Sequence, residues 1–255
     1  MSHREALLAV LEARGEEPVT DSDGLCPLLE PLARDAGGTT AFLRWPTAPE
    51  GMPTPVVRQV GMSVRLLAAS TEQFLHRVAV LREAAGRDPA LDAFYVPGTQ
   101  QASKLPVQAY LLLKVGGLPE IYEALALRHE EKGDLKAAMV TLDRCAGLFP
   151  DWGRFHVLRA QLFVQQGRDE EARDAARGAL SQPLWTLGAP PAEVAAHAGA
   201  TLSPEHYRSL EGPLLDRAAH LLDAAFLEGD WEAIREPLAV LYREAGLDKV
   251  ADFVS

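Results

Sequence analysis

The sequence predicts a mainly α fold, in which helical hairpins form a right-handed stack over residues 105–255 and follow an N-terminal helical part at residues 1–104. Three observations support this prediction. Small residues recur at an interval of 34 in the second half of the chain. Apolar residues at helical spacing follow capping residues at several places. Two β-leaning runs at residues 55–69 surround a two-residue turn, which predicts one short β-hairpin.

Composition argues against several classes of partner and site. The 255 residues carry 36 acidic and 25 basic side chains, and the net charge of −11 repels nucleic acid and anionic membranes. Apolar runs such as 110–113 are far shorter than the ~20 residues of a membrane span, so we expect no membrane insertion. Cys26 and Cys145 form no CxxC motif and are interpreted as core thiols.

The N-terminus is polar and has no apolar signal core. It predicts a soluble intracellular protein, in the cytoplasm or, if a targeting peptide has been removed, in an organelle lumen such as the matrix or stroma.

Two helices are predicted near the start of the chain. Ser2 and Glu5 form a capping box, and the apolar face that follows ends at Gly15. Leucines at helical spacing predict a second helix over residues 25–36, although two prolines weaken it.

A proline-rich crossing and the hairpin come next. Four prolines at residues 45–55 forbid regular helix, because each removes an amide donor and restricts the preceding residue. In the hairpin at 55–69, Gly61 and Met62 form the turn. A helix starting near Val56 is the alternative, but no helical stripe precedes Gly61.

Three further helical segments precede the periodic part of the chain. Ser70 and Gln73 cap a helix over residues 71–85, a short helical turn is predicted at 88–94, and 105–115 predicts a buried helix. Glycines end the last of these.

The periodic part of the chain predicts the stacked helical hairpins. The residue pairs that recur at an interval of 34 are Ala126 and Ala160, Gly133 and Gly167, and Ala138 and Ala172. The glycines provide the left-handed turn between two helices, and the alanines allow the helices of a hairpin to approach closely.

This pattern resembles the tetratricopeptide repeat family over residues 119–186. The large residue of the first helix is Tyr122 in one repeat and His156 in the next, which departs from the usual tryptophan. The resemblance implies an α-solenoid whose concave face binds segments of other proteins.

A weaker third hairpin is predicted at residues 213–245. Prolines at 183–203 interrupt the stack, with short helices at 191–200 and after Ser203, and a terminal helix at 247–253 covers the apolar end.

The candidate protein-binding face combines one helix from each repeat. Spacings of three, seven and eight residues place the acidic side chains of the first helix on one side. The proposed contact residues are Glu120, Glu123, Leu127, Glu130, Glu131, Arg154, Val157, Gln161, Val164 and Gln165. An acidic groove of this kind suits a basic or amphipathic helical partner, whereas an ordinary solvated helix surface is the alternative.

One class of partner is disfavoured by the same face. Repeat proteins that hold acidic chaperone tails use a clamp of basic and amide side chains, but the matching positions here are Glu123, Leu127 and Leu158. A chaperone C-terminal tail is therefore not expected to bind.

No familiar catalytic or nucleotide-binding motif follows a predicted strand, and no histidine pair has metal-ligand spacing. We therefore expect a non-catalytic protein-binding protein without a cofactor: an adaptor, an assembly factor or a subunit of a larger complex. An enzyme or a regulatory sensing domain with an unrecognised site remains the alternative, and the sequence does not name the partner.

Overall fold

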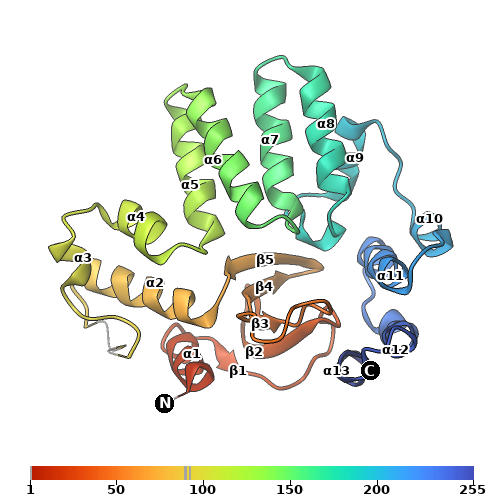
Figure 1. Ribbon diagram of the computed structural model, residues 1–255, viewed down its shortest axis with the longest axis horizontal. Coiled ribbons are helices and arrows are strands. Elements are labelled where there is room, and N and C mark those ends of the chain that lie inside the picture. Colours follow the sequence, from red (N-terminus) through yellow and green to blue (C-terminus); the bar gives the residue numbers. More distant parts are fainter. Residues whose placement is uncertain (1, 89–90, 92) are drawn as a thin grey trace.

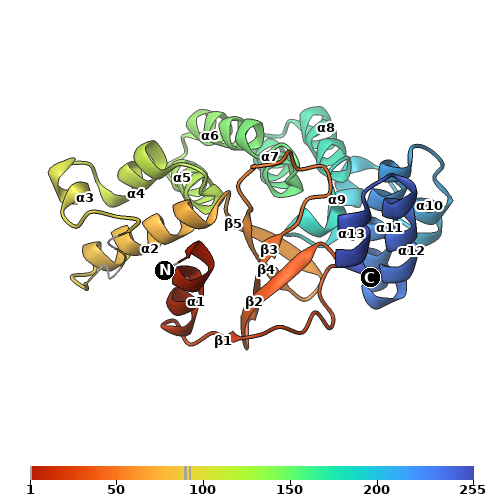
Figure 2. The same cartoon turned by 60° about the horizontal axis from the view of Figure 1, so that its bottom comes forward.

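The computed structural model describes residues 2–88, 91 and 93–255. An antiparallel sheet lies near the centre, and helices surround it on several sides (Figure 1, Figure 2). The strands are β1 (Glu17–Pro18), β2 (Leu29–Asp35), β3 (Gly38–Leu43), β4 (Val56–Val60) and β5 (Ser63–Ala68). The helices before the periodic part are α1 (His3–Glu12), α2 (Thr71–Ala84), α3 (Thr99–Ala102), α4 (Val107–Tyr110) and the π-helical turn η1 (Leu111–Val115). The later ones are α5 (Pro119–Glu131), α6 (Leu135–Leu148), α7 (Gly153–Gln165), α8 (Asp169–Leu180), η2 (Leu184–Thr186), α9 (Pro191–Ala198), α10 (Pro204–Ser209), α11 (Leu214–Glu228), η3 (Glu232–Ile234), α12 (Arg235–Glu244) and α13 (Asp248–Val254).

The strands pair in the order β1-β2-β3-β4-β5, each antiparallel to the next. The predicted β-hairpin is confirmed as β4 and β5, in which Val60 lies opposite Ser63 across a two-residue turn. Gly61 has a φ of +58°, in the left-handed region that favours glycine, which explains why glycine stands first in the turn.

The sheet is larger than the sequence predicted, because residues 29–35 of the segment predicted to be a helix at 25–36 form strand β2. This prediction was wrong. Pro31 lies at an irregularity between β2 and β3, where the register shifts before Ala33. A bulge tolerates a proline that would break a helix, and pairing with β3 supplies hydrogen bonds that no local pattern reveals.

The two faces of the sheet belong to different hydrophobic cores. Phe42 and Val56 pack with α1 and α2, whereas Leu43 and Val57 pack with the helices from α5 onward. Successive side chains of a strand point to opposite faces, so neighbouring residues enter different cores. The sheet is thus buried between the two groups of helices.

The helical hairpins of the periodic part are confirmed as α5 with α6 and α7 with α8 (Figure 1). Gly133 and Gly167 have φ values of +74° and +67°, as the predicted turns between helices require. Ala138 and Ala172 are buried where the paired helices approach. Within each hairpin, the recurring glycines therefore form the turn and the recurring alanines allow the close helix contact, as predicted.

The described residues nevertheless show no solenoid, and this part of the predicted fold is corrected. After α8 the chain turns through η2, α9 and α10, and α11 to α13 come back beside the sheet (Figure 2). Glycine and alanine at a fixed spacing indicate close packing of the two helices inside a hairpin. They do not determine whether the next hairpin continues the stack or returns to another part of the fold.

Most remaining helix predictions are confirmed. Ser2 and Glu5 form the predicted capping box of α1, and Ser70 caps α2 by accepting from the Gln73 amide at 3.1 Å. The segments predicted near residues 105–115, 191–200, 213–245 and 247–253 are helical. The helix at 105–115 was predicted to be buried, but only Tyr110 and Leu111 of it are. The short turn predicted at 88–94 lies partly outside the described residues, and the domain boundary after residue 104 stays a prediction.

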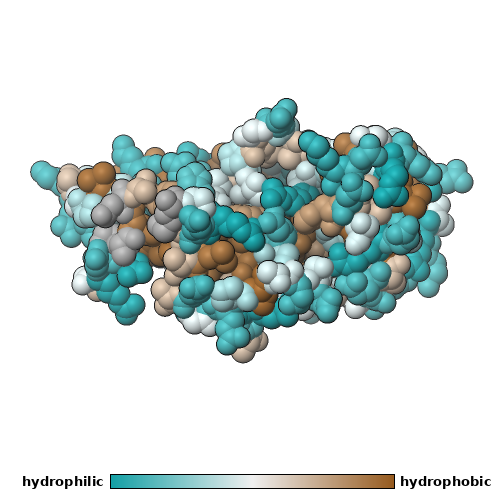
Figure 3. All heavy atoms as spheres, turned by 90° about the horizontal axis from the view of Figure 1, so that it is seen from below, coloured by the Kyte–Doolittle hydropathy of each residue, from teal (hydrophilic) through white to brown (hydrophobic). Residues whose placement is uncertain are grey.

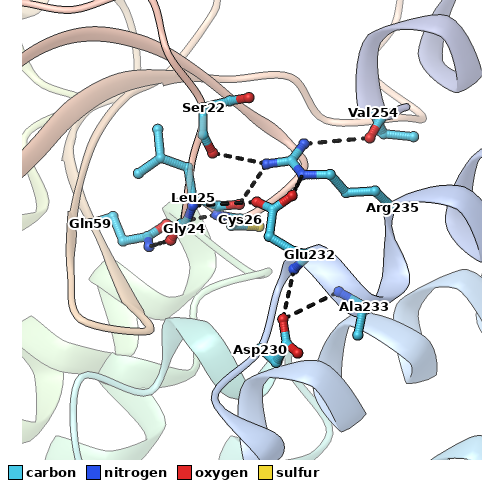
Figure 4. A network of polar contacts seen from close by, with 10 residues as sticks. All are labelled: Ser22, Gly24, Leu25, Cys26, Gln59, Asp230, Glu232, Ala233, Arg235 and Val254. Carbon is cyan, nitrogen blue, oxygen red and sulfur yellow. Dashed lines mark hydrogen bonds and ion pairs between the residues drawn. The ribbon is translucent and has the colours of Figure 1, made fainter.

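A network of polar contacts joins the C-terminal helices to the loop that precedes β2 (Figure 4). The guanidinium of Arg235 donates to the carbonyl oxygens of Ser22 at 2.9 Å and Leu25 at 3.1 Å. In return, the Gly24 amide donates to the Glu232 carboxylate at 3.3 Å.

The same loop is tied to the sheet by Gln59 of β4, as Figure 4 also shows. Its side-chain amide donates to the Gly24 carbonyl at 2.9 Å and accepts from the Cys26 amide at 2.9 Å. A buried amide that both donates and accepts satisfies main-chain groups of an irregular loop. The loop therefore bridges the sheet and α12.

Candidate protein-binding site

The structure brings the predicted faces of α5 and α7 into contact with each other. Arg154 of α7 donates through Nε to the Glu123 carboxylate at 3.2 Å, and Gln165 donates to Glu130 at 2.5 Å. The first contact lies near the N-terminal ends of the two helices, and the second lies near their C-terminal ends. Residues chosen on separate helices therefore form one continuous surface.

This surface is less acidic than the sequence suggested. Glu120 forms an ion pair with Arg77 of α2, and Glu123 forms one with Arg154. Paired charges attract a third charged group less strongly than isolated ones. Glu130 and Glu131, toward the end of α5, remain the more available carboxylates.

The apolar members of the predicted set differ in exposure. Val157 is buried in the core, so it cannot contact a partner without rearrangement. Leu127 and Val164 are exposed, as are Gln161 and Gln165. An exposed strip with two aliphatic side chains and mixed polar groups is thus present, and its role in binding stays a prediction.

A second candidate site is a cavity that lies elsewhere and was not predicted. It has a volume of about 750 Å³ and opens between the β3–β4 loop, the turn from α6 to α7, and α13. Its lining includes Trp45, Met52, Leu148, Phe149, Val250 and Phe253. A cavity of this size with mainly apolar walls is typical of sites that bind a ligand or a protein segment.

Three large apolar side chains of this cavity face solvent. Met52 is 56% exposed, Leu148 51% and Phe253 36%. They come from the proline-rich loop, the end of α6 and the last helix. Single exposed apolar residues are ordinary, but three around one cavity mark a candidate binding surface.

Aromatic rings support the floor of the cavity. Trp45 and Trp152 line it, and both pack on Trp185 of η2, with ring centroids 5.9 Å and 6.2 Å apart. Trp185 is fully buried. Tilted and edge-on aromatic pairs hold a surface rigidly, which reduces the entropy lost when a partner binds.

Polar groups lie around the same cavity. Arg44 donates to Glu30 through Nε at 2.9 Å, and Arg4 also donates to Glu30 at 2.5 Å, so the two arginines share one carboxylate and this group keeps one positive charge. Asp151 and Lys249 also line the cavity. Asp151, Lys249 and the unbalanced arginine charge beside Glu30 therefore remain to orient a bound segment.

The wider surface is patchy. Seen from below, hydrophobic residues form separate patches among hydrophilic ones (Figure 3). No single continuous apolar face dominates that view.

Both cysteines are buried, as predicted. Burial raises the pKa of Cys26 to about 12 and also raises the pKa of Cys145. Both thiols therefore stay protonated and unreactive near neutral pH.

Within the described residues, no cluster of three or more His, Cys, Asp or Glu side chains has an arrangement suited to a metal ion. In the same part of the chain, no helix combines the length and the apolar character of a membrane span.

Three models of one protein family match nearly the whole chain. They are described as PAB N-terminal over residues 1–114, PAB middle domain over 119–201 and PAB C-terminal domain over 193–255. A protein of Arabidopsis thaliana described as "Protein IN CHLOROPLAST ATPASE BIOGENESIS, chloroplastic" is 38% identical over 282 residues. The match covers 99% of this chain and 86% of that relative.

These matches overturn the predicted membership of the tetratricopeptide repeat family. The periodic segment at 119–186 falls within the region matched by the PAB middle domain. Tight helical hairpins of any family favour glycine at the turn and alanine at the close helix contact. These residues are therefore weak evidence for one family.

Proposed function

Because the chain belongs to the PAB family, we propose that it is a non-catalytic assembly factor that binds a protein subunit during biogenesis of the chloroplast ATPase. The observation that carries this proposal is the 38% identity to a relative named for that process, over 99% of this chain. Identity along the whole length supports a shared role better than one matched segment does. The proposed compartment is the chloroplast.

The cavity between the proline-rich loop, the α6–α7 turn and α13 is the proposed client-binding site. An unassembled subunit exposes apolar surface that is later buried in its complex, and such surface promotes aggregation. Covering a large apolar side chain contributes roughly 1.5–3 kcal/mol. Contact with Met52, Leu148 and Phe253 would therefore shield a client segment reversibly, because ordering that segment offsets part of the gain.

The strip on α5 and α7 is a second proposed contact, for a basic or amphipathic helix. Leu127 and Val164 supply exposed apolar side chains, and Glu130 and Glu131 supply carboxylates beside them. Such contacts mainly speed association and weaken as salt rises.

Complementation of a strain that lacks this protein tests the function and the cavity separately. We expect the strain to accumulate less assembled chloroplast ATPase on native gels, and the parent protein to restore it. The variant Met52→Lys/Leu148→Lys should fail to restore it, because charges in the cavity oppose apolar contact. The matched control is Val96→Lys/Val140→Lys, which places the same charges on residues that are 70% and 60% exposed.

The outcomes have distinct meanings. A normal amount of ATPase in the strain without the protein would refute the assembly function. Full restoration by the cavity variant, with restoration by the control, would refute only the assignment of the cavity.

A further inference from the structure

Strand β5 ends the sheet, and its outward side has no strand partner among the described residues. It pairs with β4 along one side only. The opposite edge of the sheet is the two-residue strand β1. An open strand edge presents main-chain donors and acceptors that another extended segment can use.

The hairpin geometry identifies the open groups. Val60 and Ser63 flank the two-residue turn and form the first hydrogen-bonded pair, and such pairs alternate along an antiparallel ladder. Arg58 and Arg65 form the next one. The amides and carbonyls of Val64 and Leu66 therefore point away from β4, toward the open edge.

None of the Val64 and Leu66 main-chain groups has a hydrogen-bond partner outside the hairpin in the described part of the chain. Their side chains are nevertheless buried. Main-chain groups without partners next to a hydrophobic core are costly unless water or another chain satisfies them.

A cavity of about 210 Å³ lies along this edge. Its lining includes Val64 and Leu66 of β5, Trp152 and Phe155 at the start of α7, and Pro119 of α5. Glu120 and Glu123 also line it, but they are paired with Arg77 and Arg154. The volume corresponds to roughly seven water molecules at about 30 Å³ each. The space is large enough for two small aliphatic side chains of an extended segment whose main chain lies at the strand edge, and it is too small for a helix.

One charge in this cavity lacks a partner. Arg65 lines it, is exposed, and forms no ion pair or hydrogen bond through its side chain within the described residues. Its cross-strand neighbour Arg58 is already paired with Glu16 and Asp35. Like charges directly opposite each other are unfavourable, so an acidic residue on the far side of Arg65 would relieve the repulsion.

We propose that the β5 edge binds a short extended segment of a partner protein, in which an acidic residue between two aliphatic residues lies opposite Arg65. The aliphatic residues exchange main-chain hydrogen bonds with Val64 and Leu66 and point toward Trp152 and Phe155. The acidic side chain lies on the other face of the added strand, beside Arg65, because side chains alternate. The partner is a client of the proposed assembly function, so the inference rests on that function.

The test uses the full chain and a blocked peptide, acetyl-Thr-Val-Glu-Val-Thr-amide, and does not depend on ATPase assembly. In the free protein, the amides of Val64 and Leu66 should exchange with solvent faster than those of Ser63 and Arg65. Added peptide should slow their exchange and shift their NMR resonances. Slow exchange of the Val64 and Leu66 amides before any peptide is added would show that they already have partners and would overturn the proposal.

Matched peptides and one variant test the geometry. Methylation of both valine amide nitrogens should abolish binding, because these amides donate to the strand edge. Replacement of the peptide glutamate by glutamine should weaken binding about two- to fivefold, as expected for one cross-strand charge pair. In Arg65→Gln the two peptides should bind equally.

Equal binding of the methylated peptide, no resonance shift along β5 at millimolar peptide, or an unchanged glutamate preference in Arg65→Gln would each overturn the proposal. The complementation experiment with the cavity variant is independent of these measurements. Failure of the edge proposal is thus distinguishable from failure of the assembly function.

Discussion

The Arg235 guanidinium lies 2.9 Å from the carbonyl oxygen of Ser22, a residue 213 positions earlier in the chain. A second bond to the Leu25 carbonyl and an ion pair with Glu232 hold the same side chain in place. A planar guanidinium with several donors is suited to satisfying two carbonyls at once. These contacts join the first loop to α12, and a bond from the guanidinium to the Val254 carbonyl at 3.4 Å joins α13, which lines the cavity.

Replacing Arg235 by alanine should lower the free energy of unfolding by roughly 1–3 kcal/mol, because two loop carbonyls lose their charged donor. Its side chain is only 15% exposed, so water replaces it poorly. Denaturant titration followed by circular dichroism measures the change. Arg243→Ala is the control: its ion pair with Asp252 spans 3.8 Å and its side chain is 51% exposed, so the effect should stay below about 1 kcal/mol. Equal effects of both variants would contradict the role of the Arg235 contact.

Asp223 of α11 should make stability depend on pH. Its carboxylate accepts from the Leu184 amide at 2.7 Å, and burial raises its pKa from 3.8 to about 7. The folded state therefore binds the proton more tightly than the unfolded state, so this group favours folding at low pH. That contribution is lost as pH rises from about 4 to above 7.

Asp223→Asn keeps an acceptor for Leu184 and removes the buried charge. We expect it to be more stable than the parent by roughly 1–4 kcal/mol at pH values above the folded pKa, with the difference shrinking toward acidic pH. Nearby Tyr207 has a pKa raised to about 12 by burial and by the Asp223 charge, so it stays neutral throughout. Unfolding measured across this pH range in both proteins is the check, and a gain that does not vary with pH would count against it.

The glutamates of α5 should differ in what they contribute to stability. Glu123→Lys places a cation against Arg154, and both side chains of that pair are partly buried, so we expect a loss of roughly 1–3 kcal/mol. Glu131→Lys changes an exposed residue and should stay within about ±0.5 kcal/mol. Thermal unfolding of the two variants compares them. Similar midpoints would show that the Glu123–Arg154 ion pair contributes little to stability. Glu123 would then count among the carboxylates available to a partner.

Sequence alone could predict those features of the candidate site that depend on one helix. The spacing of Glu120, Glu123 and Glu130 does place them along one side of α5. It could not show that Arg77 and Arg154 neutralise two of them, because these partners lie on other helices. The apolar cavity was missed altogether, because Met52, Leu148 and Phe253 come from three distant segments.

Local interactions determined most of the helices and one hairpin. Local effects can be predicted from the sequence because they act within a few residues. Examples are the capping residues Ser2 and Ser70, the left-handed glycines between helices, and Gly61 in its turn. Only the tertiary structure decided that residues 29–35 form a strand and that the last helices return to the sheet. Strand pairing and the contact of Arg235 with Ser22 depend on groups far apart in the chain, whose hydrogen bonds and buried surface form only when the whole chain is folded.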